Sequence, residues 1–180
     1  MKRQIILTTL LALTALYAAP TAWAGDPASD YQMSVVLDRA YGDVVSRGNY
    51  ERAILRISSH PDRFPYASAT NLCVAHTMVG QFRHAEHYCD KAVEEAEKAA
   101  ATGRRKSRDY TAEWALAYSN RGVLRARRGD HEGAAHDFRM AIEKQSVSEL
   151  PVHNLARLSK ESPDYLALET RPNEDDEDKD

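Results

Sequence analysis

The segment Gly129-Asp130-His131-Glu132-Gly133-Ala134 has two related copies earlier in the chain. They read GNYERA at residues 48–53 and GQFRHA at residues 80–85. In all three, an aromatic residue or a histidine follows the glycine by two places, and an alanine follows it by five. Each copy lies between two segments with helical periodicity, so the repeat predicts stacked helix hairpins, an architecture that usually presents a surface for partners.

The residues around each turn indicate how the two helices of a hairpin pack. The glycine is expected to end the first helix in a left-handed conformation, which costs glycine least. Asn49, Gln81 or Asp130 then precedes the second helix, and Asn and Asp are good helix caps. Small residues where the helices cross, such as Gly122, let the two backbones approach closely.

This pattern resembles the tetratricopeptide repeat over roughly residues 34–145. The third copy matches the family motif at Tyr118, Asn120, Gly122, Gly129, Asp130, Ala134, Phe138, Ala141 and Ile142. The second copy matches it at Asn71, Leu72, Gly80, Phe82, Ala85, Ala92 and Val93, with Cys73 at a small-residue position. The first copy keeps Gly48, Tyr50 and Ala53 but has His60 in place of the late alanine. The resemblance implies an all-α, right-handed solenoid of three hairpins followed by a C-terminal capping helix.

The hairpins are expected at about residues 31–61, 66–101 and 107–145, within a repeat domain covering residues 25–160. The first helix should run from Asp30 to Ser46, and the capping helix should cover residues 147–159. The three glycines are separated by 32 and then 49 residues. Against a family period near 34, about 15 residues are inserted after the second copy, so two long helices should project there.

The first 24 residues have the form of an export signal. Lys2 and Arg3 precede a short apolar segment, and Ala22-Trp23-Ala24 is a small-x-small cleavage site before Gly25. The apolar segment is too short to span a bilayer comfortably. The sequence therefore predicts a periplasmic or secreted protein, and a bacterial periplasm is the first choice.

Removing the two basic residues of the signal changes the net charge from −3 to −5. The last eight residues hold six acids and one lysine, so the tail accounts for this imbalance. Residues 161–180 are expected to form a disordered acidic tail. Export and this charge balance both argue against nucleic-acid binding.

The only two cysteines, Cys73 and Cys89, lie on opposite sides of Gly80, seven residues before it and nine after it. The arms of an antiparallel hairpin bring such positions together, and export would place them in an oxidising compartment. A disulfide is the favoured interpretation, and two buried thiols are the alternative. A catalytic redox pair would usually need a Cys-x-x-Cys spacing, which is absent.

The sequence contains no nucleophile elbow, phosphate loop or dinucleotide fingerprint, so we expect a non-catalytic protein without a cofactor. His84 and His87 share a helix face near Glu86 and Asp90, and such a pair can bind a metal when other ligands converge. A solvated helix face is the favoured interpretation, and no metal is expected.

In the resembled family, the first helices of the hairpins line a concave groove, which would here be neutral and built from small residues. The corresponding positions are Val35, Asp38, Gly42, Val45, Thr70, Val74, Thr77, Ser119, Val123 and Ala126. One hypothesis is that a helix or an extended segment of a partner protein docks there. Two alternatives remain open: the small residues simply permit tight packing, or the protein's own cap or termini fill the groove.

A second candidate surface is a basic stripe formed by Arg121, Arg125 and Arg128, which align on one helix face. Arg127 and the basic residues between 104 and 108 are close in sequence. The stripe would suit an anionic envelope lipid, a polymer or an acidic protein segment, and the acidic tail would compete for it. The alternative is a solvated face balanced by neighbouring acids.

The sequence thus predicts a non-catalytic adaptor or scaffold of the bacterial cell envelope that binds a protein partner in the groove. The second hypothesis is a binder of anionic envelope material that uses the basic stripe. Neither the partner nor the oligomeric state follows from the sequence.

Overall fold

The computed structural model describes residues 30–38, 41–60, 64–102, 110–144 and 148–163. These residues contain seven helices and no strand, so the all-α prediction is confirmed for them. The helices are α1 (Gly42–Ser46), α2 (Tyr50–Ser58), α3 (Pro65–Met78), α4 (Phe82–Thr102), α5 (Tyr110–Arg127), α6 (His131–Glu143) and α7 (Leu150–Glu161).

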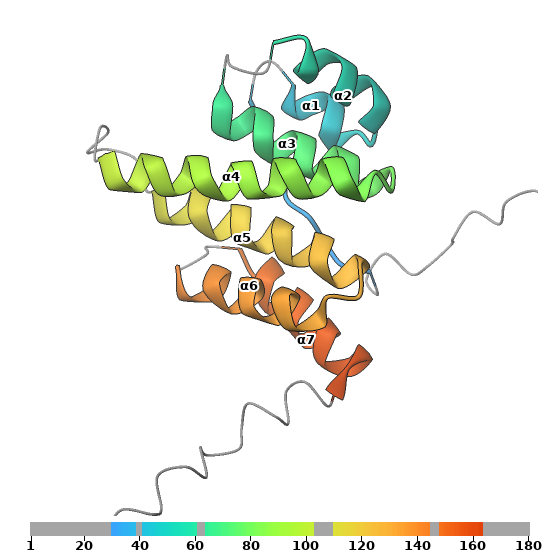
Figure 1. Cartoon of the computed structure of the whole chain (residues 1–180), viewed down its shortest axis with the longest axis vertical. Coiled ribbons are helices and arrows are strands. Elements are labelled where there is room, and N and C mark those ends of the chain that lie inside the picture. Colours follow the sequence, from blue (N-terminus) through green and yellow to red (C-terminus); the bar gives the residue numbers. More distant parts are fainter. Residues whose placement is uncertain (1–29, 39–40, 61–63, 103–109, 145–147, 164–180) are drawn as a thin grey trace, which may run out of the picture.

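Consecutive helices pack as antiparallel neighbours, and the best-developed hairpins are α3 with α4 and α5 with α6 (Figure 1). The first helices of successive hairpins also touch, because α3 contacts α5 and α5 contacts α7. One face of the array is therefore built from α3, α5 and α7. We call it the inner face.

The three repeated turns share one backbone geometry. Gly48, Gly80 and Gly129 have φ angles of 75°, 74° and 80°, which confirms the predicted left-handed conformation. At each turn the glycine N–H bonds to the carbonyl three residues back, and the next N–H bonds to the carbonyl five residues back. These two hydrogen bonds end the first helix and direct the chain into the second, antiparallel helix. Of the expected caps, Asp130 accepts a bond from the Gly133 N–H at 3.0 Å, whereas Asn49 makes no side-chain cap bond.

The helix crossings follow the small-residue prediction. A Cβ atom added to Gly122 would lie 2.6 Å from the Phe138 ring, so only glycine lets α5 and α6 approach this closely. Ala92 and Ala141 are buried together in a second core cluster. Close packing of this kind leaves little room for larger side chains at these positions.

The first hairpin differs from the prediction. Residues 31–38 are not helical, and α1 has only five residues, so the expected helix from Asp30 to Ser46 is wrong. The chain turns back before α1, where a Cβ atom on Gly42 would lie 2.4 Å from the Val36 carbonyl oxygen. The Asp38 carboxylate accepts bonds from the Tyr41 and Gly42 N–H groups and stabilises this turn. Before the turn the segment is extended.

The later elements agree more closely with the sequence. The predicted long helices correspond to α4, with 21 residues, and α5, with 18, and α4 extends past α3 (Figure 1). The predicted cap corresponds to α7, which has Pro151 in its first turn and packs against α6. None of the described helices combines the length and apolar character needed to cross a bilayer.

Several predictions lie outside the described residues. These are the export signal at residues 1–24, the basic cluster at residues 104–108 and residues 164–180 of the acidic tail.

Candidate functional site

Three buried asparagines mark the inner face. Asn71 lies on α3, Asn120 on α5 and Asn154 on α7, and their exposed fractions are 0%, 1% and 0%. A primary amide buried this deeply needs hydrogen-bond partners for its donors and its acceptor. We call these three residues the asparagine row.

The partners of the asparagine row come from the N-terminal end of the described chain. Asn154 pairs with Gln32, Asn120 with Ser34 and Asn71 with Val36. In each pair the side-chain oxygen accepts from the backbone N–H at 2.9 Å, and the side-chain nitrogen donates to the carbonyl of the same residue at 2.8–3.0 Å. We call residues 31–36 the N-terminal strap. It crosses the inner face from α7 to α3, and Figure 1 shows it in blue beside α5.

Every second residue of the strap pairs with an asparagine, and this follows from the geometry of an extended chain. In a strand, every second residue presents its N–H and C=O groups to the same side. Gln32, Ser34 and Val36 therefore turn their backbone groups toward the row, one residue per helix. The amide of asparagine carries a donor and an acceptor side by side, so it pairs with such a residue much as a neighbouring strand would.

The other residues of the strap provide apolar contacts. Tyr31 is buried against Phe138, with ring centroids 6.3 Å apart. Met33 packs against three separate clusters of the core, and Val35 packs against the first of them. The strap thus contacts α7, α5 and α3 through its backbone and the core beneath through alternate side chains.

The Tyr31 end of the strap is held by polar and ionic contacts. The Tyr31 hydroxyl donates to Glu161, and the Arg157 guanidinium lies 4.9 Å above the ring. Burial and the bond to Glu161 raise the pKa of Tyr31 well above its usual value, so this phenol stays protonated. Next to it, Asp30 forms an ion pair with Arg127 at 3.0 Å.

The predicted groove residues do not form an open surface. Thr70, Val74, Thr77, Ser119, Val123 and Ala126 lie on α3 and α5, and all are buried. Val45 belongs to the first core cluster, Val35 lies within the strap, and Asp38 and Gly42 form the turn before α1. Of the interpretations left open by the sequence, the one in which a terminal segment of the chain fills the groove describes this face.

The sequence alone does not single out the asparagine row as a site, although Asn71 and Asn120 are part of the repeat motif. The signal that could have revealed it is a spacing. Asn154 follows Asn120 by 34 residues, which is the period of the repeat that the sequence resembles and would give α7 the register of the first helix of a further hairpin.

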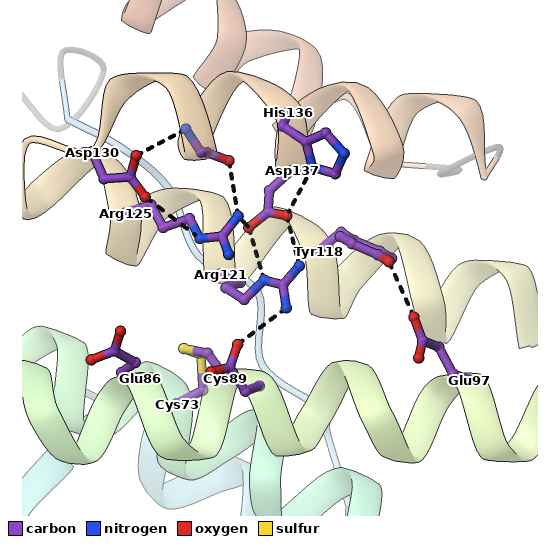
Figure 2. A network of polar contacts seen from close by, with 12 residues as sticks. Cys73, Glu86, Cys89, Glu97, Tyr118, Arg121, Arg125, Asp130, His136 and Asp137 are labelled. Atoms are coloured by element: carbon purple, nitrogen blue, oxygen red, sulfur yellow. Dashed lines mark hydrogen bonds and ion pairs between the residues drawn. A yellow bond between two sulfur atoms is a disulfide. The ribbon is translucent and has the colours of Figure 1, made fainter.

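The basic stripe is paired with nearby acids, and Figure 2 shows these contacts for Arg121 and Arg125. Arg121 binds Asp137 through two bonds of 2.9 Å and also binds Asp90 at 3.1 Å. Arg125 lies 3.0 Å from Asp137, whose side chain is fully buried.

Arg125 and Arg128 have further acidic partners. Arg125 has a second, longer ion pair with Asp130 at 3.8 Å, and Arg128 pairs with Glu86 at 2.8 Å. Burial alone would lower the pKa of Arg121, but the hydrogen bonds and charge of Asp137 hold it above its usual value. Four carboxylates thus face three guanidinium groups, which corresponds to the balanced-face alternative.

The disulfide prediction is confirmed in the structure. Cys73 of α3 and Cys89 of α4 are bonded, and both residues are fully buried. The histidines take part in ring contacts: His84 stacks on buried His76, and His87 lies edge-on to Tyr88. Within the described ranges, no group of three or more His, Cys, Asp or Glu side chains is arranged to bind a metal.

Comparison with known proteins found no matching family model, no similar curated protein and no similar solved structure. The functional proposal therefore rests on the geometry of the inner face.

Proposed function

We propose that this protein is a non-catalytic interaction module, an adaptor or scaffold of the bacterial cell envelope with a tetratricopeptide-like, right-handed repeat architecture. In this proposal the inner face binds an extended segment of a partner protein. The observation that carries the proposal is that three asparagines, one on each of α3, α5 and α7, hold an extended backbone by paired hydrogen bonds.

Recognition through the backbone suits an adaptor. The asparagine row supplies to an extended segment the kind of bonds that an exposed sheet edge supplies in strand addition. Each such bond contributes about 0.5–1.5 kcal/mol net, and an unpaired buried amide costs about 1–3 kcal/mol. The asparagine amides are buried and paired when an extended segment covers the row, so a bound segment must supply both a donor and an acceptor to each of them.

The envelope location is supported by two independent features. The first is the predicted export signal at residues 1–24. The second is the Cys73–Cys89 disulfide, because such bonds persist mainly in oxidising compartments such as the periplasm.

The basic stripe offers less support for the second hypothesis, a binder of anionic envelope material. Its three arginines are already paired with Asp90, Asp137, Asp130 and Glu86. An anionic ligand would have to displace these carboxylates, and Asp137 is buried beneath the guanidinium groups. We therefore place the partner site on the inner face.

The proposal can be tested by capturing partners from an envelope extract with immobilised chains that begin at residue 25. A Tyr31→Ser/Met33→Ser chain should be used as the background, because it weakens the contacts of the strap and leaves the asparagine row intact. In this background, Asn120→Ala removes the central pair. Asn49→Ala is the matched control, since Asn49 is exposed and makes no side-chain cap bond.

A protein retained at low and high salt by the Asn49→Ala chain and lost from the Asn120→Ala chain would support the proposal. Equal retention by both chains would contradict it. Loss of binding at high salt from both chains would point to ionic contacts elsewhere on the molecule.

A further inference from the structure

The strap indicates what kind of partner segment the inner face accepts, an inference that rests on the proposed function. We propose that the asparagine row binds in trans an extended segment with apolar side chains at three alternate positions. The first is an aromatic residue with a polar tip, the second a long flexible side chain and the third a β-branched one. The strap is the displaceable stand-in for that segment within the same chain.

The polar contacts of the asparagine row do not depend on which side chains stand at positions 32, 34 and 36. All six bonds from Asn71, Asn120 and Asn154 go to backbone N–H and C=O groups. The side chains of Gln32, Ser34 and Val36 are half-buried, as are those of Met33 and Val35. Any residue except proline can supply these backbone groups, so the row selects an extended conformation and leaves these positions free.

Selectivity for the bound segment comes from the side chains at positions 31, 33 and 35. Tyr31 stacks on Phe138 while its hydroxyl reaches Glu161, so this position accommodates an aromatic ring with a donor at its tip. Met33 touches three core clusters, and a flexible thioether side chain can fill such an irregular site. Val35 contacts one cluster only, where a short branched side chain suffices.

The strap has the features of an exchangeable element. It belongs neither to a helix nor to a sheet, and its backbone is bonded to the side chains of the asparagine row. The disulfide lies between α3 and α4 and does not fix it. The α3–α4 and α5–α6 hairpins contain none of its residues.

Occupation in cis lowers the apparent affinity for a segment in trans. The apparent dissociation constant equals the intrinsic one divided by the fraction of molecules whose face is uncovered. A change in the row weakens the cis and trans segments alike, so its effect is visible only when the strap is already disabled. For this reason the row variants are compared in the Tyr31→Ser/Met33→Ser background.

The test measures binding of a fluorescent nonapeptide that copies residues 30–38. Two altered peptides accompany it: one has serine at the positions of Tyr31, Met33 and Val35, and the other has an N-methyl group on the amide of Ser34. The methyl group removes the donor to Asn120 and changes no side chain.

We expect the strap-disabled chain to bind the native peptide at least about tenfold more tightly than the unaltered chain does, which corresponds to about 1.4 kcal/mol. Adding Asn120→Ala, or using the N-methyl peptide, should weaken binding about tenfold. Adding Asn49→Ala should leave binding unchanged, and the serine peptide should not bind.

Several results would overturn the inference. These are no binding by a strap-disabled chain that keeps its helicity and its disulfide, or equal binding of the native, serine and N-methyl peptides. A third is an unaltered chain that forms dimers which the peptide dissociates, because the occupant would then be a second copy and not another protein.

A second variant keeps the test informative if the double substitution does not fold. Ser34→Pro removes the Ser34 N–H that donates to Asn120 and keeps the Tyr31 and Met33 side chains, and the native peptide should raise the melting temperature of this variant while the serine peptide does not. Absence of any shift would overturn the inference. If peptide binding fails but envelope capture still depends on Asn120, only this inference falls, whereas failure of both removes the proposed function as well.

Discussion

Asp137 is a single carboxylate held by two guanidinium groups, those of Arg121 and Arg125, with no exposed side-chain surface. A buried pair that loses one partner leaves an uncompensated charge, which typically costs about 3–5 kcal/mol. We therefore predict that Asp137→Asn lowers the free energy of unfolding by roughly 3 kcal/mol, measured by urea denaturation.

The matched control is Asp90→Asn, which removes an exposed carboxylate from the same Arg121. An exposed ion pair contributes about 0–1 kcal/mol, so this variant should stay within that range of the parent chain. Equal effects of the two substitutions on the free energy of unfolding would show that the burial of Asp137 does not determine its contribution to stability.

His76 gives the fold a dependence on pH. It is buried in α3, its Nδ1 lies 2.7 Å from Gln81, and its ring stacks between His84 and Tyr88. Burial lowers the pKa of His76 below 6.5, and the charge of His84 lowers it further. Between that lowered pKa and 6.5, the unfolded chain binds a proton that the native chain does not.

Stability should therefore fall as the pH drops below about 6.5 and level off below the native pKa of His76. We predict that His76→Phe, which keeps a flat ring and cannot be protonated, makes the free energy of unfolding less dependent on pH between about 7 and 5. The control is His136→Phe, because His136 is largely exposed. An unchanged pH slope in His76→Phe would assign the dependence to other groups.

The α3–α4 hairpin is the element that the disulfide stabilises directly. Cys73 and Cys89 are 16 residues apart, and closing a loop of this size stabilises a protein by about 3 kcal/mol in the chain-entropy treatment. We predict that Cys73→Ala/Cys89→Ala lowers the free energy of unfolding by about that amount and leaves the helical circular dichroism signal in place. The same loss should follow reduction of the unaltered chain, and a stability that is insensitive to both treatments would contradict the prediction.

The helices and turns could be predicted from the sequence because their causes are local. Gly48, Gly80 and Gly129 adopt a left-handed conformation that glycine adopts most easily, and the hairpins follow from that spacing. The disulfide could be predicted for the same reason, since the turn at Gly80 brings its two cysteines together.

The strap could not be predicted because its partners are distant. Its backbone bonds reach across 122, 86 and 35 residues to Asn154, Asn120 and Asn71. Locally, the apolar run before Asp38 suits a buried helix as well as an extended segment, and periodicity alone does not separate the two. The same reason applies to the basic stripe: its spacing on one helix is visible in the sequence, but the acids that pair with it lie on α4 and α6.

At the scale of the whole molecule, the strap joins helices that the chain order keeps apart. Asn154 holds its first pair on α7, and Asn71 holds its last pair on α3. We predict that Asn154→Ala lets the strap loosen from the Gln32 end, because the pairs at Ser34 and Val36 remain.

Hydrogen exchange resolved by residue can measure this. The Gln32 amide should exchange faster in Asn154→Ala than in the parent chain, while the Val36 amide should keep most of its protection. Asn49→Ala should change neither rate. Loss of protection at all three strap amides together would mean that the strap detaches as one unit, and an unchanged rate at Gln32 would mean that Asn154 does not hold it.

The position of the strap in the chain also determines the order in which its contacts can form during synthesis. Gln32 leaves the ribosome long before Asn154, which is 122 residues further along the chain. At about 5–20 residues per second, the strap waits on the order of ten seconds for its last partner to be synthesised. During that interval the hairpins around Gly80 and Gly129 can form from local contacts, whereas contacts of long sequence separation form late. A newly made chain can therefore fold its α3–α6 hairpins while the Gln32 end of the strap still lacks its partner Asn154.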